Sequence, residues 1–178
     1  MKKILMIMLC ILIAILTGCG RMSDSEKAED ITYGKTMISI YTTKLGSSLD
    51  SYMSFISNIK NSGQAQNKSN ASQGTYKEKL KNADQEYELE TLVSTTKENA
   101  EEIKSTEFVK EKNDTLEADE IREKAQILYQ TNKELSDLSQ ELLDAYKKGL
   151  YPDKMGDYLQ NKAMPFLSKT RDKFKQEK

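Results

Sequence analysis

The sequence predicts an all-α protein, an elongated antiparallel bundle of three long helices followed by a shorter C-terminal helix that proline breaks. Three observations predict this class. Apolar residues recur at spacings of three and four along most of the chain. No stretch of useful length alternates apolar and polar residues as a β-strand does. Tryptophan is absent and phenylalanine numbers four, so a thin core of Leu, Ile, Met, Ala and Tyr is expected.

The first helix is expected to begin at residues 23–26, which have the S-x-x-E spacing of a capping box. Its apolar stripe consists of Ile38, Tyr41, Leu45, Leu49, Tyr52, Ile56 and Ile59. The helix is predicted to end near Lys60, because residues 61–74 contain no large apolar side chain to offset the entropy of ordering them. Residues 61–74 are therefore predicted to form a flexible loop in which the chain reverses.

The second helix is expected to begin at another capping box, residues 75–78, and to continue to Ile103. Its apolar stripe is weaker than that of the first helix. Residues 105–114 are predicted to form a short turn around Phe108 and Val109.

The third helix has the strongest pattern in the chain, with near-heptad spacing over about thirty residues. The stripe consists of Ile121, Ala125, Leu128, Asn132, Leu135, Leu138 or Ser139, Leu142 and Tyr146. Lys147 and Lys148 complement the negative end of the helix dipole. Gly149 suits the left-handed position after a helix, and Pro152 prevents its continuation.

A last amphipathic helix is expected after Pro152, with an apolar face formed by Met155, Tyr158, Leu159, Ala163, Phe166, Leu167 and Phe174. Pro165 must bend or split this helix, because proline lacks a backbone N–H and its ring clashes with the preceding turn.

The first residues of the chain have the pattern of an export signal. Lys2 and Lys3 precede an unbroken apolar run at residues 4–16, which is shorter than the roughly 20 residues that a membrane-spanning helix needs. Residues 16–19, Leu-Thr-Gly-Cys, resemble the lipobox of bacterial lipoproteins. The resemblance implies cleavage between Gly18 and Cys19 and conversion of Cys19 to an N-palmitoyl, S-diacylglyceryl cysteine. A retained membrane span and ordinary secretory cleavage are the alternatives.

Domain organisation follows from this signal. Residues 1–18 are predicted to be a cleaved lipoprotein signal peptide, residues 19–25 a lipidated tether and residues 26–178 a helical bundle domain. Two or more acyl chains hold a protein stably on a membrane, whereas one chain gives only marginal binding. The predicted location is therefore the extracytoplasmic face of the cell membrane.

Composition excludes several classes of function. Removal of residues 1–18 leaves 25 basic and 28 acidic side chains, a charge of about −3 that does not favour nucleic acid. Loss of Cys10 and lipidation of Cys19 leave no thiol for a disulfide, so stability must come from packing. Histidine is absent, which excludes Ser-His-Asp and Cys-His catalysis and histidine-based zinc sites. No phosphate-binding or dinucleotide-binding glycine motif occurs, so no cofactor is predicted.

Paired carboxylates could still hydrolyse a glycosidic bond. The acidic pairs Glu101–Glu102 and Asp119–Glu120 are examples. Both pairs lie on predicted polar helix faces among lysines, which favours a solvated surface. No catalytic residue is predicted.

Residues 113–120, Asn-Asp-Thr-Leu-Glu-Ala-Asp-Glu, are the strongest candidate for a calcium loop. They lack the glycine and the ligand alternation of an EF-hand. Capping of the third helix by Asp114 or Thr115 explains the same residues, so no metal site is predicted.

Tyrosine and asparagine offer candidate binding residues. Several tyrosines coincide with apolar stripes and are expected at the rim of the core: Tyr41, Tyr52, Tyr87 and Tyr146. Tyr151, beside the turn at Pro152, is the candidate for an exposed aromatic binding residue. Asn132 is either a buried amide that fixes helix register or oligomeric state, or an amide at the edge of the stripe bonded to water.

Residues 142–153, together with the helices joined by a polar loop, resemble small all-helical lipoproteins of Gram-positive bacteria, some of which are described as cell-wall-binding. The expected function is a membrane-anchored, non-enzymatic interaction module at the cell envelope. Its partner is expected to be a protein or a cell-wall polymer, and the apolar stripes could also close between copies as a homo-oligomer. The alternatives are an exclusion or immunity lipoprotein of a phage or conjugative element and a carboxylate-dependent hydrolase.

Overall fold

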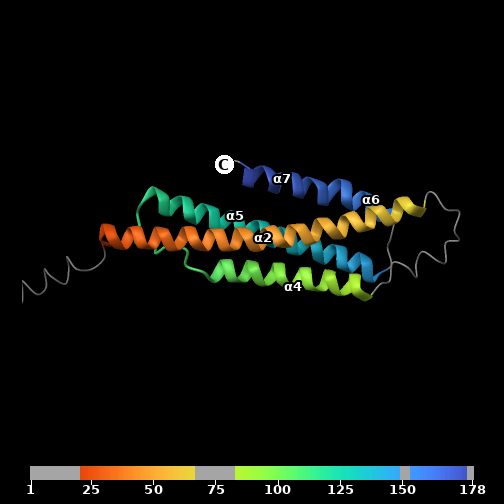
Figure 1. Cartoon of the computed structure of the whole chain (residues 1–178), viewed down its shortest axis with the longest axis horizontal. Helices are drawn as coiled ribbons and strands as arrows, with labels where there is room; N and C mark the ends of the chain where they lie inside the picture. The colour runs from red at the N-terminus through yellow and green to blue at the C-terminus, as the bar shows by residue number, and fades with distance from the viewer. Residues whose placement is uncertain (1–20, 67–82, 149–152, 176–178) are drawn as a thin grey trace, which may run out of the picture. The chain divides into compact units, whose positions relative to one another are not determined.

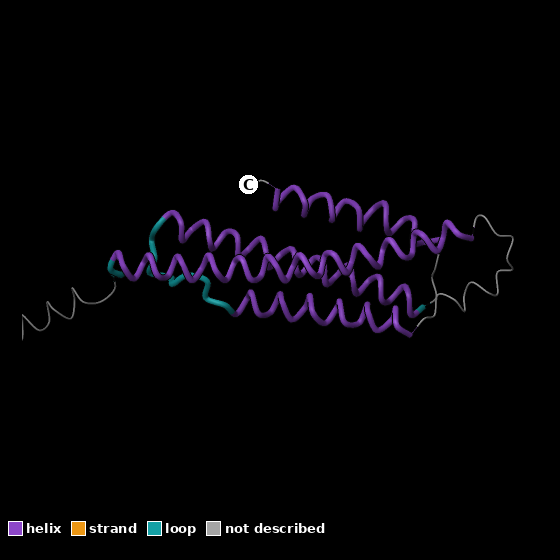
Figure 2. Tube along the Cα trace, viewed as in Figure 1, coloured by secondary structure: helices purple, strands orange, loops and turns teal. Residues whose placement is uncertain are grey.

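The computed structural model describes residues 21–66, 83–148 and 153–175. This part of the protein is all-α and contains no strand (Figure 2). The three long helices are α2 (Asp24–Gln66), α4 (Ala83–Ser105) and α5 (Leu116–Lys147). The shorter C-terminal helix consists of α6 (Asp153–Tyr158), the π-helix η1 (Leu159–Ala163) and α7 (Met164–Lys175). The predicted fold class is therefore confirmed.

The chain divides into two compact units, to each of which α2 and α5 contribute residues. Within the described part, unit 1 consists of residues 21–39 and 107–125. Unit 2 consists of residues 40–66, 83–106, 126–148 and 153–175.

In unit 1, α2 begins with the predicted capping box. The Ser23 backbone N–H donates to Glu26 Oε2 at 2.8 Å, and the Glu26 N–H donates to Ser23 Oγ at 3.3 Å. These bonds satisfy backbone groups that have no partner within the helix. The hydrogen bond from the Ser23 N–H lowers the pKa of the Glu26 carboxyl below its ordinary value.

A buried carboxylate on α2 holds the segment before α5 in unit 1. Asp30 is only 8% exposed and accepts the Lys110 backbone N–H at 3.0 Å and Asn113 Nδ2 at 2.9 Å. Arg122 of α5 donates to the backbone carbonyls of Lys110 at 2.9 Å and Asn113 at 2.8 Å. Because burial of an unpaired carboxylate is costly, these bonds explain how Asp30 is accommodated.

Gly34 lets the same segment pack against α2 in unit 1. A Cβ atom at Gly34 would lie 2.7 Å from the Phe108 carbonyl oxygen and 2.8 Å from Val109 Cγ1. Phe108 and Val109 are each 5% exposed, so the predicted turn places both side chains in the core of this unit. Glycine is therefore required at residue 34 by a close approach of the backbone.

The N-terminus of α5 is capped by Thr115, as the sequence predicts. Its Oγ1 accepts the Ala118 backbone N–H at 3.2 Å. Asp114 pairs with Lys27 of α2, and the hydrogen bond from Lys27 lowers the pKa of the Asp114 carboxyl. The acidic segment at residues 113–120 therefore begins the helix and anchors it to α2.

In unit 2, α4 runs antiparallel to α2. Tyr41 near the start of this part of α2 has its hydroxyl 3.2 Å from Thr106 Oγ1, just after α4. Further along α2, Lys44 Nζ lies 2.5 Å from Glu102 Oε2, which precedes Thr106 in the chain. Figure 1 shows α4 alongside this part of α2.

The remaining helices of unit 2 also alternate in direction. Lys147, the last residue of α5, has its Nζ 2.6 Å from Glu90 Oε1 near the start of α4, so α4 and α5 are antiparallel. On the C-terminal helix, Lys169 Nζ lies 3.3 Å from Glu134 Oε2 of α5. Tyr158, which precedes Lys169 in the chain, donates to the carbonyl of Leu138, which follows Glu134. The C-terminal helix is therefore antiparallel to α5 as well.

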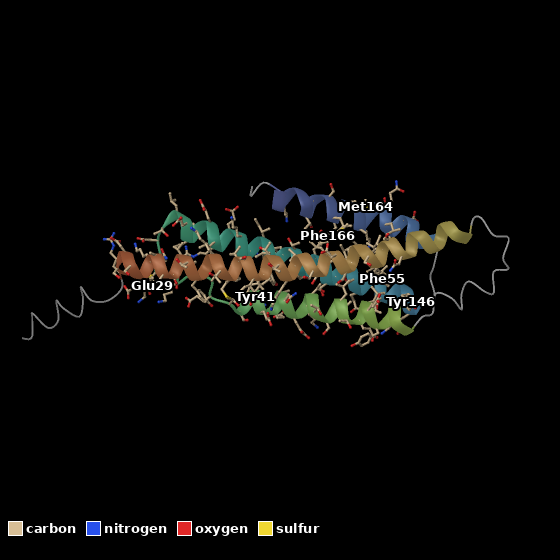
Figure 3. All side chains as sticks on the ribbon, in the orientation of Figure 1. Glu29, Tyr41, Phe55, Tyr146, Met164 and Phe166 are labelled. Carbon is tan, nitrogen blue, oxygen red and sulfur yellow. The ribbon has the colours of Figure 1, made fainter. Side chains whose placement is uncertain are left out.

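Tyr52 lies at the centre of the core of unit 2, where α2, α5 and the C-terminal helix meet. The side chain is fully buried, and its hydroxyl lies 2.6 Å from the Tyr158 hydroxyl, which donates to the Leu138 carbonyl. The Tyr52 ring meets Phe166 edge-on, at 6.3 Å between centroids and 88° between planes. Figure 3 labels Phe166 on the C-terminal helix. Burial raises the pKa of Tyr52 to about 12.

Pro165 breaks the C-terminal helix as predicted. Pro165 is the second residue of α7, and the π-helix Leu159–Ala163 directly precedes α7. A wider turn at this point accommodates a ring that would clash with the carbonyl four residues earlier in a regular α-helix.

The predicted end of the first helix is wrong. α2 continues past Lys60 to Gln66, so residues 61–66, expected in the loop, are helical. Extension of an existing helix costs much less than nucleation. Relative to Ala, the residues Asn, Ser and Gln each lower helix stability by less than about 1 kcal/mol and Gly63 by about 1 kcal/mol, so the helix can continue through them. Several predictions lie outside the described residues: the rest of the loop at 67–74, the capping box at 75–78 and the helix-ending residues Gly149 and Pro152.

Candidate functional site

A groove of about 880 Å³ lies between α2 and α4 in unit 2. Four serines and two threonines line it: Ser47, Ser48, Ser51 and Ser54 from α2, and Thr91 and Thr95 from α4. We call it the serine groove. The four serines are spaced so that they share a face of α2, since residues three and four apart are neighbours on a helix.

The floor of the serine groove is apolar. It is formed by Phe55 of α2 and by Leu89 and Leu92 of α4, which are 4%, 0% and 6% exposed. Figure 3 labels Phe55 on α2. The groove therefore offers apolar contact at its base and polar groups along its walls, as ligand sites commonly do.

Two serines of the wall use their hydrogens within α2. Ser47 Oγ donates to the Thr43 carbonyl at 3.3 Å, and Ser51 Oγ donates to the Ser47 carbonyl at 3.1 Å. A hydroxyl oxygen that donates once keeps two lone pairs. Ser47 and Ser51 therefore present hydrogen-bond acceptors to the groove.

Asn99 of α4 adds an unpartnered donor to the wall. The residue is 6% exposed and lines the groove, and its Nδ2 is buried without a hydrogen-bond partner among the described residues. A buried donor without a partner costs about 1–3 kcal/mol of folding free energy. Such groups are rare in folded proteins, and each requires an explanation.

The charged side chains of the groove are predominantly acidic. At one end Lys44 pairs with Glu102 and lies over the Tyr41 ring, with Nζ 5.0 Å from the ring centroid. Asp50, Glu88 and Glu98 also line the groove and make no ion pair among the described residues. Glu98 accepts a hydrogen bond from Ser94 Oγ at 2.9 Å. The lining thus has an excess of three negative charges.

Tyr87 of α4 corrects one sequence prediction. Tyr41, Tyr52 and Tyr146 are buried, as expected for core-rim residues, but Tyr87 is 71% exposed and lines the serine groove. The helical spacing placed it in a stripe, whereas the packing of α4 turns Leu89 and Leu92 inward and leaves Tyr87 at the surface. Tyr151, the predicted exposed tyrosine, lies outside the described residues.

The sequence left two alternatives for Asn132, a buried amide and a solvated amide at the edge of the stripe. The structure shows the buried amide. It is fully buried, and its Nδ2 donates to the Leu128 carbonyl at 2.9 Å, so the solvated position at the edge of the stripe is wrong. Its Oδ1 has no hydrogen-bond partner in the part of the chain that the structure describes. The role in helix register or oligomeric state stays a prediction.

Of the other candidate residues, Glu102 lies at one end of the serine groove, where it pairs with Lys44. Gly18 and Cys19 lie outside the described residues. The acidic pairs are exposed: Glu101 and Glu102, and Asp119 and Glu120. Of these, Asp119 pairs with Arg122 at 2.6 Å. Among the described residues, no group of three or more acidic side chains is placed to hold a metal ion.

The serine groove is not among the sites predicted from the sequence. The regular spacing of serines in the first helix was the available signal. The buried, unpartnered Nδ2 of Asn99 could not be predicted from the sequence, because its burial depends on which helices pack against α4.

In the part of the chain that the structure describes, no helix combines the length and apolarity of a membrane span. The chain matches no model of a known protein family, no curated protein and no solved structure. The candidate site therefore has to be interpreted from its own geometry.

Proposed function

We propose that the protein is a membrane-anchored, non-enzymatic binding protein on the extracytoplasmic face of the cell membrane, and that the serine groove is its binding site. The observation that carries the binding role is the buried, unpartnered Nδ2 of Asn99 in the groove wall. A ligand that supplies an acceptor would remove the cost of this orphaned donor.

The membrane anchor rests on the sequence. Residues 16–19 resemble a lipobox, and residues 4–16 form the apolar run that precedes it. Acyl chains on Cys19 would hold the protein at the membrane, where the serine groove would meet proteins or polymers of the envelope.

Replacement of Cys19 tests the anchor. Cells grown with a radioactive fatty acid are expected to label the wild-type protein and a Cys10→Ser control, while Cys19→Ser is unlabelled. Cys10 is the matched control because it lies within the apolar run of the signal. Label that persists on Cys19→Ser would show that acylation occurs elsewhere.

The non-enzymatic role has a separate test. The full chain is expected to leave peptidoglycan and phospholipid intact during prolonged incubation. Cleavage of either substrate, abolished by a single substitution such as Glu98→Gln or Glu88→Gln, would identify a carboxylate-dependent hydrolase and contradict the proposal.

A further inference from the structure

We propose that the serine groove binds an extended, lysine- or arginine-bearing segment of a partner protein. This inference rests on the binding role of the groove proposed above and does not depend on the lipid anchor. Its basis is the charge, the hydrogen-bonding inventory and the length of the groove.

Charge selects a cationic ligand. Lys44 pairs with Glu102, which leaves Asp50, Glu88 and Glu98 as lining carboxylates without an ion pair among the described residues. Three carboxylates along one groove attract ammonium or guanidinium groups and repel an acidic segment. A neutral sugar chain would leave these charges without a counter-charge.

Tyr87 adds a second feature that suits a cation. Its ring is 71% exposed and precedes Glu88 on α4. A lysine or arginine placed over an exposed tyrosine ring gains a cation–π interaction in addition to its attraction to a carboxylate. This end of the groove is therefore suited to one basic side chain of the ligand.

The hydrogen-bonding groups of the wall match an extended backbone. Ser47 and Ser51 present acceptors for backbone N–H groups, and Asn99, also in the lining, carries the buried donor Nδ2, which has no partner among the described residues. In an α-helix the backbone groups are already bonded to one another, except at the termini. An extended segment has free N–H and C=O groups and can use all three wall residues.

The dimensions also fit an extended segment. The lining runs along α4 from Tyr87 to Glu102, which corresponds to roughly 22 Å at the rise of an α-helix. About seven extended residues span this distance. Alternate side chains of such a segment point to opposite sides, so apolar ones can contact Phe55, Leu89 and Leu92 while basic ones face the carboxylates.

Calorimetry with defined probes tests the inference. The full chain is titrated with a blocked octapeptide in which lysine alternates with leucine and serine, with the same peptide carrying glutamate for lysine, and with an N-acetylglucosamine tetramer. The lysine peptide is expected to bind, more weakly at higher salt, while the other two probes do not. Tight binding of the sugar tetramer or of the glutamate peptide would overturn the inference.

Two matched triple variants locate the interaction. The first variant, Asp50→Asn/Glu88→Gln/Glu98→Gln, removes the groove carboxylates. It is expected to weaken lysine-peptide binding at least about tenfold, because three exposed ion pairs with the peptide are lost. The control Glu111→Gln/Glu120→Gln/Glu123→Gln removes the same charge from exposed residues outside the groove and is expected to change affinity less than about twofold. Equal losses would show that the peptide responds to net charge alone.

A steric variant gives an independent result. Ser51→Trp fills the groove and is expected to abolish peptide binding, while Ser57→Trp on an exposed position of the same helix preserves it. Circular dichroism verifies that each variant is folded. Retained binding by folded Ser51→Trp would place the peptide elsewhere and contradict the inference. If the sugar tetramer binds and Ser51→Trp abolishes that binding, the inference of a peptide ligand is contradicted, while the proposed binding role of the serine groove is supported.

Discussion

Gly34→Ala tests the packing of unit 1 most sharply. In this unit the Phe108 carbonyl oxygen, Val109 Cγ1 and Ile121 Cδ1 lie 2.7, 2.8 and 3.0 Å from the position of a Cβ atom at Gly34. The nearest of these atoms belongs to the backbone, in a segment held by the bonds of Asp30 to Lys110. The segment can therefore yield only if those bonds are strained.

The net effect of Gly34→Ala combines two opposing terms. Overpacking of a well-packed site costs about 1–3 kcal/mol, and the higher helix propensity of alanine offsets about 1 kcal/mol. Because a backbone atom obstructs the new methyl group, we expect the upper part of this range, a net loss of about 2 kcal/mol. For a chain of this length the melting temperature should fall by about 4–8 °C.

Gly46→Ala is the matched control, since no described atom outside the adjoining backbone of α2 and the neighbouring residues lies within 4 Å of a Cβ at that position. This substitution should stabilise the protein by up to about 1 kcal/mol through helix propensity alone. Both variants are compared with the wild type by urea and thermal unfolding followed by circular dichroism. If Gly34→Ala were as stabilising as Gly46→Ala, the close approach of Phe108 to α2 would be refuted.

Three further predictions concern buried polar groups. Asn99→Leu should raise the free energy of unfolding by about 1 kcal/mol, because it removes an orphaned donor, and should weaken lysine-peptide binding; a lower melting temperature would show that Asn99 is structural. Asp30→Ala should lower the free energy of unfolding by about 2–3 kcal/mol and accelerate hydrogen exchange of the Lys110 amide. An unchanged exchange rate would contradict the bond between Asp30 and Lys110. Because its folded-state pKa of about 12 lies above the ordinary tyrosine value of 10.0, Tyr52 contributes stability below pH 10 that is lost as the pH rises to about 12. In an absorbance titration of tyrosinate, Tyr52→Phe should remove the step near pH 12; simultaneous titration of all tyrosines near pH 10 would contradict its burial.

The sequence predicted those parts of the fold that local signals determine. The Ser23 capping box, the Thr115 cap and the break at Pro165 each depend on residues within one or two helical turns. The stripe of α5 also predicted its core residues, and Leu128 and Leu135 are buried to 1% and 0% exposure. Local geometry alone fixes which side chains share a face of these helices.

The remaining features depend on contacts between helices and could not be predicted from one segment. Asp30 has the sequence context of an exposed helix residue, and only the return of Lys110 and Asn113 buries it. Tyr87 fits an apolar stripe by spacing, yet the orientation of α4 leaves it exposed. Asn99 became a candidate binding residue only when its neighbours on α2 and α4 were known.

The side-chain amide of Asn99 provides the most direct test of a binding role for the serine groove. Nuclear magnetic resonance of the isotope-labelled full chain reports its Nδ2 hydrogens during titration with the lysine octapeptide. A ligand that accepts from Asn99 should shift these signals with the same affinity that calorimetry measures, and slow their exchange with water. Unchanged Asn99 signals, with shifts confined to residues outside the groove, would contradict the account.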